Sequence, residues 1–440
     1  MKTIAEGMEV FQEVSERLLT DLQVYLEPYG AVVGDARFRK GLNELVAGML
    51  GAGSPQMTKA ASSAPGQVKA SFSLAKRFYR LMGSENYSHE DWLKALQADA
   101  RAVVEQANPE QVIVALDMVN FEQPYAEHVE GISTVHKATP PGPDGKARLT
   151  SGFPTVMCEI VNVTQPTIPY AHFFSYTTPD FLSQNREVQR AIREVVAVLN
   201  GYSVCFVTDS EWDDQAMFAY LAAQEETTFI IRAKYNRRLQ VYNERLDRWE
   251  NDYLWDLRDS MAGQVCRKTF FRHAGQTRVG RSTLDWIQAR FAPDAPTYWA
   301  VIIDTDLFNT PLVLWTNRAV SDAEQALTVY ANWQRRPTIE HLHRFIQEDG
   351  LLVEDMQLEP LESKRRLFLL ILATALFVLR LPDLWEPSLI TWVRQLASAI
   401  MGTAMDREGF YLLLYGLTAV LTTLATLHAA AVRHPSQSYG

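Results

Sequence analysis

The sequence predicts an α/β (α+β) fold, in which a mixed sheet flanked by helices lies between a helical N-terminal region and a helical C-terminal region. Two observations carry this prediction. Short runs of β-branched and other apolar residues, the pattern of buried strands, occupy the middle of the chain. Before and after that middle part, apolar residues recur at three- and four-residue intervals, which is the periodicity of amphipathic helices.

Bulk composition sets the class of protein. With 440 residues, of which 47% are hydrophobic and 21% charged, the chain has the composition of a globular protein and is long enough for roughly two to four packed units. Cys158, Cys205 and Cys266 stand far apart, which argues against a disulfide framework and a zinc site and favours a reducing cytoplasm. Acidic residues near the N-terminus argue against a signal peptide.

The net charge of −10 argues against DNA binding by the surface as a whole, because phosphate contacts need basic residues. Basic residues gather locally, however, in four groups. Each group on its own is better explained as a solvated helix or loop face. The groups lie at residues 69–80, 232–238, 267–272 and 335–344.

The elements follow in order along the chain. Residues 1–108 are predicted to form a helical domain, because side chains such as Leu18, Leu22, Leu45 and Met49 recur at helical intervals. Residues 109–235 then predict three strands, a helix, a strand, a helix and a strand, which is the order of an RNase H-like fold. The strands are expected at 112–118, 155–163, 168–175, 203–208 and 228–233, and the helices at 185–200 and 212–223.

The second half of the chain adds to this pattern. Residues 236–310 combine short strand-like pieces with polar turns and predict a β-rich insertion, after which residues 311–350 complete the core. Residues 351–440 are predicted to be helical. Their stretch 410–432 is long enough to span a bilayer, but Gly416, His428 and several threonines favour a buried helix or a helical interface.

Three acidic residues form the candidate site. Asp117 lies in the first predicted strand and Asp209 at the end of the fourth, and these strands are neighbours in the predicted order. Glu340 lies on a helix expected to pack against that sheet. Each acid alone is more often a cap, a turn residue or a solvated side chain. Together they predict the oxygen-rich site in which two Mg²⁺ ions support phosphoryl transfer.

Around Glu340 the chain reads Trp333-x2-Arg336-x3-Glu340-x6-Gln347, and around Asp209 it reads VTDSEWDD. Both segments resemble the DDE transposases of the cut-and-paste insertion-sequence class, in which the first pattern is Y-x2-R-x3-E-x6-K. All intervals are preserved, while Trp333 replaces a tyrosine and Gln347 replaces a lysine that contacts DNA phosphate in the family. The resemblance runs from about residue 117 to residue 381.

The resemblance implies a transposase that cuts the ends of an insertion sequence and joins them to target DNA. It implies double-stranded DNA as the partner, a homodimer in the synaptic complex, no membrane, and a cytoplasmic location at the bacterial nucleoid. Asp117, Asp209 and Glu340 would ligate two Mg²⁺ ions, for which Mn²⁺ is expected to substitute. The side chains expected to face DNA are those of Trp333, Arg336, Arg344 and Gln347.

The resemblance also assigns roles to other parts of the chain. The N-terminal helices match the layout of the family's DNA-binding region, and the β-rich insertion is expected to close over the site. Some members of the family place a tryptophan in the region of the insertion to stack on a flipped base, and Trp315 is the candidate for that role nearest to the last acid, although its apolar strand favours a core position. His341 and His343 are secondary DNA-facing candidates, for which a structural role is the simpler prediction.

Three alternatives remain open on the sequence. The first is a domesticated or inactive transposase that binds DNA without cutting it, which Trp333, Gln347 and the acidic net charge favour. The second is an RNase H-like nuclease or junction resolvase, which would share the metal chemistry but would not join strands. The third is a membrane-associated protein anchored by its apolar C-terminal helix.

Overall fold

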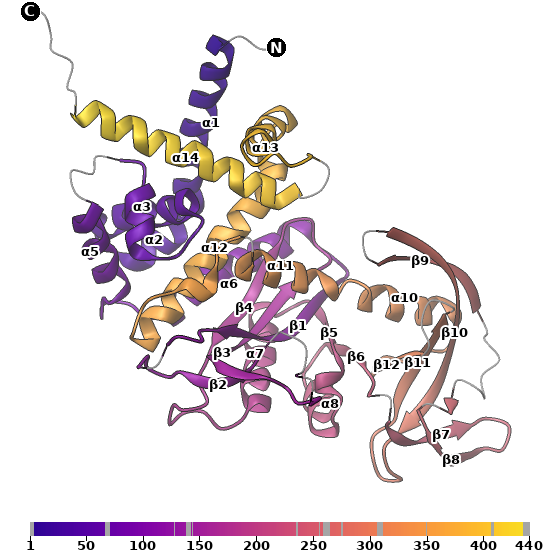
Figure 1. Ribbon diagram of the computed structural model, residues 1–440. Coiled ribbons are helices and arrows are strands. Elements are labelled where there is room, and N and C mark those ends of the chain that lie inside the picture. Colours follow the sequence, from indigo (N-terminus) through magenta and orange to yellow (C-terminus); the bar gives the residue numbers. More distant parts are fainter. Residues whose placement is uncertain are drawn as a thin grey trace, which may run out of the picture.

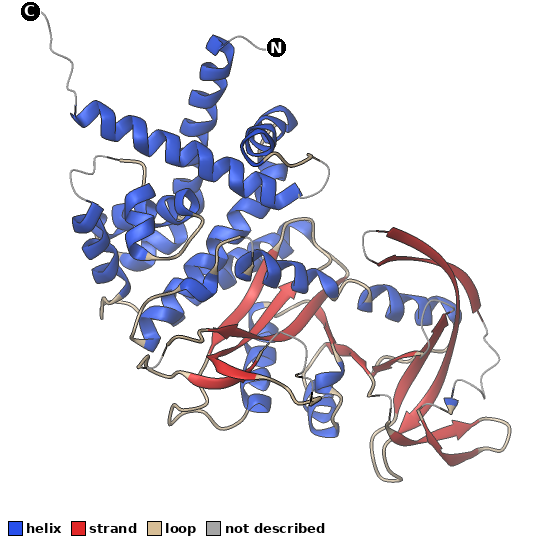
Figure 2. Ribbon diagram, viewed as in Figure 1, coloured by secondary structure: helices blue, strands red, loops and turns tan. Residues whose placement is uncertain are grey.

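The computed structural model describes residues 4–66, 71–126, 128–137, 142, 144–234, 236–254, 256–257, 265–273, 276–305, 311–348, 350–405 and 409–433. Within these ranges the chain has a mixed α/β architecture, in which one long mixed sheet is flanked by helices (Figure 1). Helices from both ends of the chain gather at one end of the sheet, and the other end extends away from them as a β-rich lobe (Figure 2).

The N-terminal region is helical. Asp35 caps α3 by accepting a hydrogen bond from the N–H of Arg37, and Ser88 and Asp91 form a capping box at the start of α6. Such caps explain where these helices begin. The helices of this region are α1 (Ile4–Tyr25), α2 (Glu27–Val33), α3 (Ala36–Ala52), α4 (Met57–Ser63), α5 (Ser71–Met82) and α6 (His89–Ala107).

The sheet is mixed and runs the length of the structure. Its strand order is β2-β3-β1-β5-β6-β12-β11-β10-β7-β8, with β4 also paired to β3 and β9 to β10. β1 is parallel to β5 and β5 to β6, and the other pairs are antiparallel. The strands are β1 (Gln111–Glu122), β2 (Ser133–His136), β3 (Leu149–Ile160), β4 (Thr167–Phe173), β5 (Ser203–Thr208), β6 (Thr227–Arg232), β7 (Arg238–Asn243), β8 (Arg248–Tyr253), β9 (Val265–His273), β10 (Gln276–Arg290), β11 (Tyr298–Thr305) and β12 (Leu312–Thr316).

Helices cover both faces of the first part of the sheet. On one face, Phe121 of β1 packs against Phe173 of β4 and Phe368 of α12 (Leu361–Leu384), at ring-centroid distances of 6.1 and 5.4 Å. On the opposite face, His172 of β4 lies 3.8 Å from Glu187 of α7 (Gln184–Val198). Five further helices complete the described chain: α8 (Gln215–Ala222), α10 (Ala323–Trp333), α11 (Pro337–Gln347), α13 (Pro387–Met401) and α14 (Gly409–Arg433).

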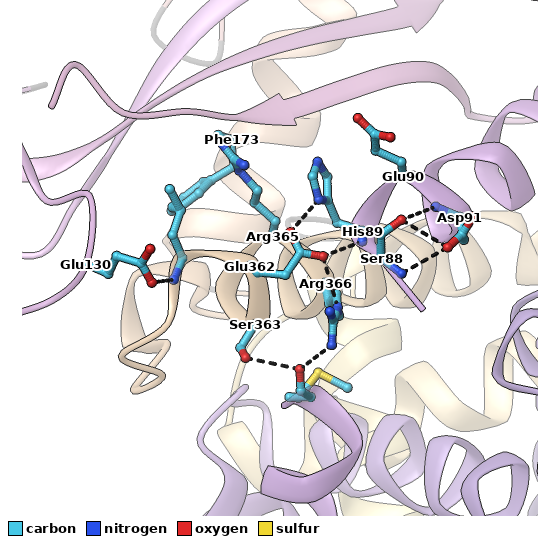
Figure 3. Close-up of polar contacts among 12 residues, drawn as sticks. Ser88, His89, Glu90, Asp91, Glu130, Phe173, Glu362, Ser363, Arg365 and Arg366 are labelled. Atoms are coloured by element: carbon cyan, nitrogen blue, oxygen red, sulfur yellow. Dashed lines mark hydrogen bonds and ion pairs between the residues drawn. The ribbon is translucent and has the colours of Figure 1, made fainter. Parts of the chain in front are cut away.

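The first turn of α12 joins the N-terminal helices to the rest of the chain (Figure 3). Glu362 accepts a hydrogen bond of 2.7 Å from the N–H of His89, whose ring Nδ1 lies 2.6 Å from the same carboxylate. Arg366 contacts Glu362 at 3.1 Å and donates to the carbonyl oxygen of Met82 at 2.8 Å. Further along α12, Arg380 makes a bidentate pair with Asp99 of α6. These polar contacts hold α5, α6 and α12 together.

Two described helices, α12 and α14, are long and apolar enough to cross a membrane by length and composition. In α12, 78% of the most apolar window is buried inside the structure, so α12 is a core helix. In α14 the buried share is 39%. Both are weak signals of a membrane span, because core helices of globular proteins have the same length and composition.

Three strands were not predicted from the sequence. β2 is only four residues long, which is too short to be recognised as an apolar run. β8 and β10 are rich in charged and polar residues, so they lack the apolar runs by which buried strands are detected. β8 is polar because it forms the edge of the sheet.

Candidate active site

The three predicted acids converge on one arginine. Nη2 of Arg336 lies 3.0 Å from Oδ1 of Asp117 and 3.9 Å from Oδ2 of Asp209, while Nη1 forms an ion pair with Oε1 of Glu340. The four residues come from β1, the end of β5 and the start of α11. The structure therefore brings the acids together around a positive charge.

Strand pairing places the two aspartates at the same edge. β1 and β5 are parallel neighbours, and Ala115 is opposite Val207 in this pair. Because side chains alternate along a strand, Asp117 and Asp209, each two residues further on, extend on the same face. Asp209 directly follows β5 and accepts a hydrogen bond of 2.6 Å from the N–H of Ser210, which fixes one carboxylate oxygen.

Local helix geometry places the other two residues. Arg336 is the N-cap residue of α11, and Pro337 follows it in the first turn, where proline fits because its missing N–H has no partner there. Glu340 lies four residues after Arg336, so the two side chains lie on the same face of the helix one turn apart. Glu340 is the most exposed of the three acids, with 52% of its side chain accessible, against 14% for Asp117 and 36% for Asp209.

Burial dominates the electrostatics of Asp117. It raises the pKa of the Asp117 carboxyl to about 6, although the Arg336 guanidinium acts in the opposite direction. The negative charges of Glu340 and Asp209 raise this pKa further. Burial alone would lower the pKa of Arg336, but the three carboxylates raise it above its ordinary value. The guanidinium is therefore charged at neutral pH.

His343 is a buried neighbour of Asp117. Its Nδ1 lies 3.7 Å from Oδ2 of Asp117, and its side chain is 8% exposed. Burial lowers the pKa of His343 to about 3, and the charge of Arg336 adds to that effect, so the imidazole is neutral at neutral pH. Among the described residues, Nε2 of His343 has no hydrogen-bond partner.

The other predicted site residues lie around this cluster. Trp333 is half-buried against the core, and its indole Nε1 is buried without a partner among the described residues. Arg344 is exposed and lies 3.7 Å from Glu348. Gln347 donates hydrogen bonds of 3.3 Å to the carbonyl oxygen of Asn120 on β1 and to Glu354. The side chain of Gln347 is therefore engaged within the fold.

Two acids that follow Asp209 have structural roles. Asp213 is fully buried, lies 2.8 Å from Arg237 and accepts a hydrogen bond of 2.7 Å from the N–H of Lys234, so it fixes the segment between β6 and β7. Asp214 is the N-cap of α8 and accepts from the N–H of Met217. Asp213 and Asp214 are therefore engaged within the fold. Trp315 is fully buried between Phe218 and Phe291, which confirms the core position predicted for it.

Arg232 was not singled out as a site residue from the sequence, whereas His343 was a secondary DNA-facing candidate for which a structural role was the simpler prediction. Arg232 ends β6, half of its side chain is exposed, and its Nη1 lies 3.8 Å from Oδ1 of Asp209. Its position could have been inferred, because β5 and β6 are predicted neighbours and their last residues meet at one edge. The burial of His343 follows from its place on the apolar face of α11, between Leu342 and Phe345.

The donor set suits a hard divalent cation, because Asp117, Asp209 and Glu340 offer carboxylate oxygens. In the structure these oxygens are arranged around the guanidinium of Arg336. Within the described ranges, no group of three or more His, Cys, Asp or Glu side chains is spaced to hold a metal ion as it stands. The chemistry of the ligands fits a metal site, while their present spacing fits a cationic side chain.

A comparison of the chain with protein-family models gives no match, and a comparison with curated protein sequences gives none either.

Proposed function

We propose that the chain is a DDE transposase with an RNase H-like catalytic core, which cuts and joins DNA with Mg²⁺ ions held by Asp117, Asp209 and Glu340. The observation that carries this proposal is the convergence of the three carboxylates on Arg336 from three separate elements. Arg336 balances one carboxylate, and Arg232, which lies 3.8 Å from Asp209, balances a second. The third acid at the same place exceeds what these two arginines need, which weighs toward a function beyond stability.

The sheet topology supports the RNase H-like part of the proposal. β4, β3, β1, β5 and β6 lie side by side in that order, and β1, β5 and β6 are parallel while β3 is antiparallel to β1 and β4. An RNase H-like core has this arrangement, with two acids on adjacent parallel strands. The β-rich lobe enters between β6 and α10, where the resemblance to the transposase family implies an insertion.

Each residue of the site would have a separate role in the reaction. When bound, two metal ions would activate the attacking oxygen and stabilise the leaving one. Arg336 offers a planar guanidinium that can bind a phosphate beside the scissile bond through two hydrogen bonds. Arg232 adds a second, exposed cation on the open side of the site. His343 is neutral and buried, so it is suited to support Asp117 rather than to contact DNA.

The partners follow from the same proposal. Double-stranded DNA, as transposon end and as target, would approach from the side on which Glu340 and Arg232 are exposed. A homodimer would hold two ends together. The exposed apolar side chains of the last two helices are candidates for its interface, and they are those of Ile400, Met401, Phe410 and Leu427.

The test begins with the DNA on both sides of the coding region, which is expected to contain short inverted repeats bounded by a direct duplication. A duplex carrying one such end is incubated with the full-length chain in Mg²⁺ or in EDTA. We expect cleavage at the end and joining to a second duplex in Mg²⁺ alone, and loss of both in Asp209→Asn. Asp214→Asn is the matched control, because asparagine caps a helix as well as aspartate does.

Other results would favour other functions. Cleavage without joined products would identify a nuclease. DNA binding by a folded chain without cleavage would favour an inactive, DNA-binding descendant of a transposase, and the engagement of Gln347 within the fold is the observation that speaks for this second function. The absence of both binding and cleavage would refute the proposal.

A further inference from the structure

The guanidinium of Arg336 occupies the place at which the three carboxylates meet. We propose that Arg336 is the resting occupant of the metal site, and that divalent ions bind tightly only after this side chain has moved away to a DNA phosphate. The inference rests on the proposed function, because it takes the three carboxylates to be metal ligands.

The geometry makes Arg336 and a metal ion competitors. Nη2 contacts Asp117 at 3.0 Å and lies 3.9 Å from Asp209, and Nη1 pairs with Glu340. A hard cation takes oxygen ligands at roughly 2.0 to 2.6 Å. An ion that bound the same oxygens at such distances would stand where the guanidinium nitrogens are. Both cannot be bound to the three acids at once.

Burial blocks the other approaches to Asp117. Its carboxylate lies between Arg336, whose side chain is 10% exposed, and His343, whose side chain is 8% exposed. The open side of the site is formed by Asp209 and Glu340, whose side chains are 36% and 52% exposed. An ion arriving from solvent therefore meets these two acids first, and it reaches Asp117 only when Arg336 has left.

The contacts of Arg336 with the described residues leave one of its hydrogen-bond donors unused. Its Nε is buried and has no partner among the described residues, so the guanidinium does not use all its donors in this position. A phosphate arriving beside Glu340 offers bidentate acceptors to the same group. Binding of DNA would thus free the carboxylates at the moment when a substrate is present, and metal would follow DNA into the site.

The experiment measures metal binding by the full-length chain without DNA, with Mn²⁺ as the probe and the electron paramagnetic resonance signal of free Mn²⁺ as the readout. We expect Arg336→Gln to lower the Kd for Mn²⁺ by about tenfold or more, because a positive charge within 4 Å of the ligands is removed. Arg232→Gln is the matched control, because it removes an arginine that lies near Asp209 without filling the site. Its effect is expected to stay below about threefold.

The double variant Arg336→Gln with Asp117→Asn separates the inference from the proposed function. Loss of the gained affinity in the double variant would locate the ion at Asp117 and support the inference. An unchanged Kd in Arg336→Gln, with wild-type Mn²⁺ binding still sensitive to Asp117→Asn, would overturn the competition while leaving the metal site in place. Binding that is insensitive to Asp117→Asn in every variant, or no binding in any, would overturn the metal site itself.

Discussion

Glu159 is an acid buried in the sheet, and no described residue gives it a counter-charge. It lies on β3 opposite Ala115 of β1, is 3% exposed, and its Oε2 has no hydrogen-bond partner among the described residues. Burial raises the pKa of the Glu159 carboxyl to about 8. The folded protein therefore keeps this group protonated and neutral at pH 7.

The effect on stability follows from the difference between the folded and unfolded chains. The ordinary pKa is 4.5, so between pH 4.5 and 8 the folded chain holds a proton that the unfolded chain has released. The raised pKa leaves the free energy of unfolding unchanged below pH 4.5, and it lowers that free energy progressively as the pH rises to 8. Compared with a neutral side chain, Glu159 costs about 1 kcal/mol at pH 5 and about 4 kcal/mol at pH 8.

The perturbation is Glu159→Gln, which keeps the shape and removes the titration. We expect its free energy of unfolding, measured in urea and compared with the wild type, to gain about 3 kcal/mol more at pH 8 than at pH 5. Glu225→Gln, at an exposed position, is the control. An equal change at both pH values in Glu159→Gln would show that the folded protein stabilises the charged carboxylate, and it would refute the reasoning.

Two further substitutions test the packing. Asp99→Ala is expected to lower the free energy of unfolding in urea by about 3 to 5 kcal/mol. The reason is that the guanidinium of Arg380, whose side chain is 5% exposed, would lose its carboxylate partner. A loss below about 1 kcal/mol would contradict a stabilising role of this ion pair. Gly48→Ala is expected to cost about 1 to 3 kcal/mol, because its Cβ would lie 2.3 Å from the carbonyl oxygen of Ala60. Gly41→Ala on the same helix is the control, because an added Cβ there would meet no atom nearer than 4.0 Å, and it is expected to raise the midpoint of thermal unfolding slightly. Equal effects of the two glycine substitutions would refute the close contact at Gly48.

The predictable part of the fold is the part with strong local patterns. The apolar runs of β1, β5 and β6 could be recognised as buried strands, because these strands are covered on both faces and need apolar residues throughout. The acids could be located for a related reason. Asp209 ends an apolar run, and an acid at such a position stands out against the strand that precedes it.

The remaining part depends on contacts between distant segments. β10 was missed because its residues are mostly polar, and its place in the sheet comes from pairing with β9 and β11. Arg336 was predicted to face DNA, but its pairing with three acids could not be predicted, because the spacing of residues along the chain does not contain this geometry. Gln347 was predicted to face DNA, and in the structure its side chain contacts Asn120 and Glu354. Its hydrogen bond to a backbone carbonyl oxygen of β1 cannot be predicted from the types of side chain in the sequence.

The central claim is that the three carboxylates act together in metal-dependent cutting of DNA. The most direct measurement is the rate of end cleavage in Mg²⁺ by the wild type and by Glu340→Gln, which keeps the size of the most exposed acid and removes its charge. We expect the wild type to cleave in Mg²⁺ and not in EDTA, and the variant to lose at least about a hundredfold in rate while it still binds DNA. Cleavage by Glu340→Gln at the wild-type rate would contradict the assignment of this site.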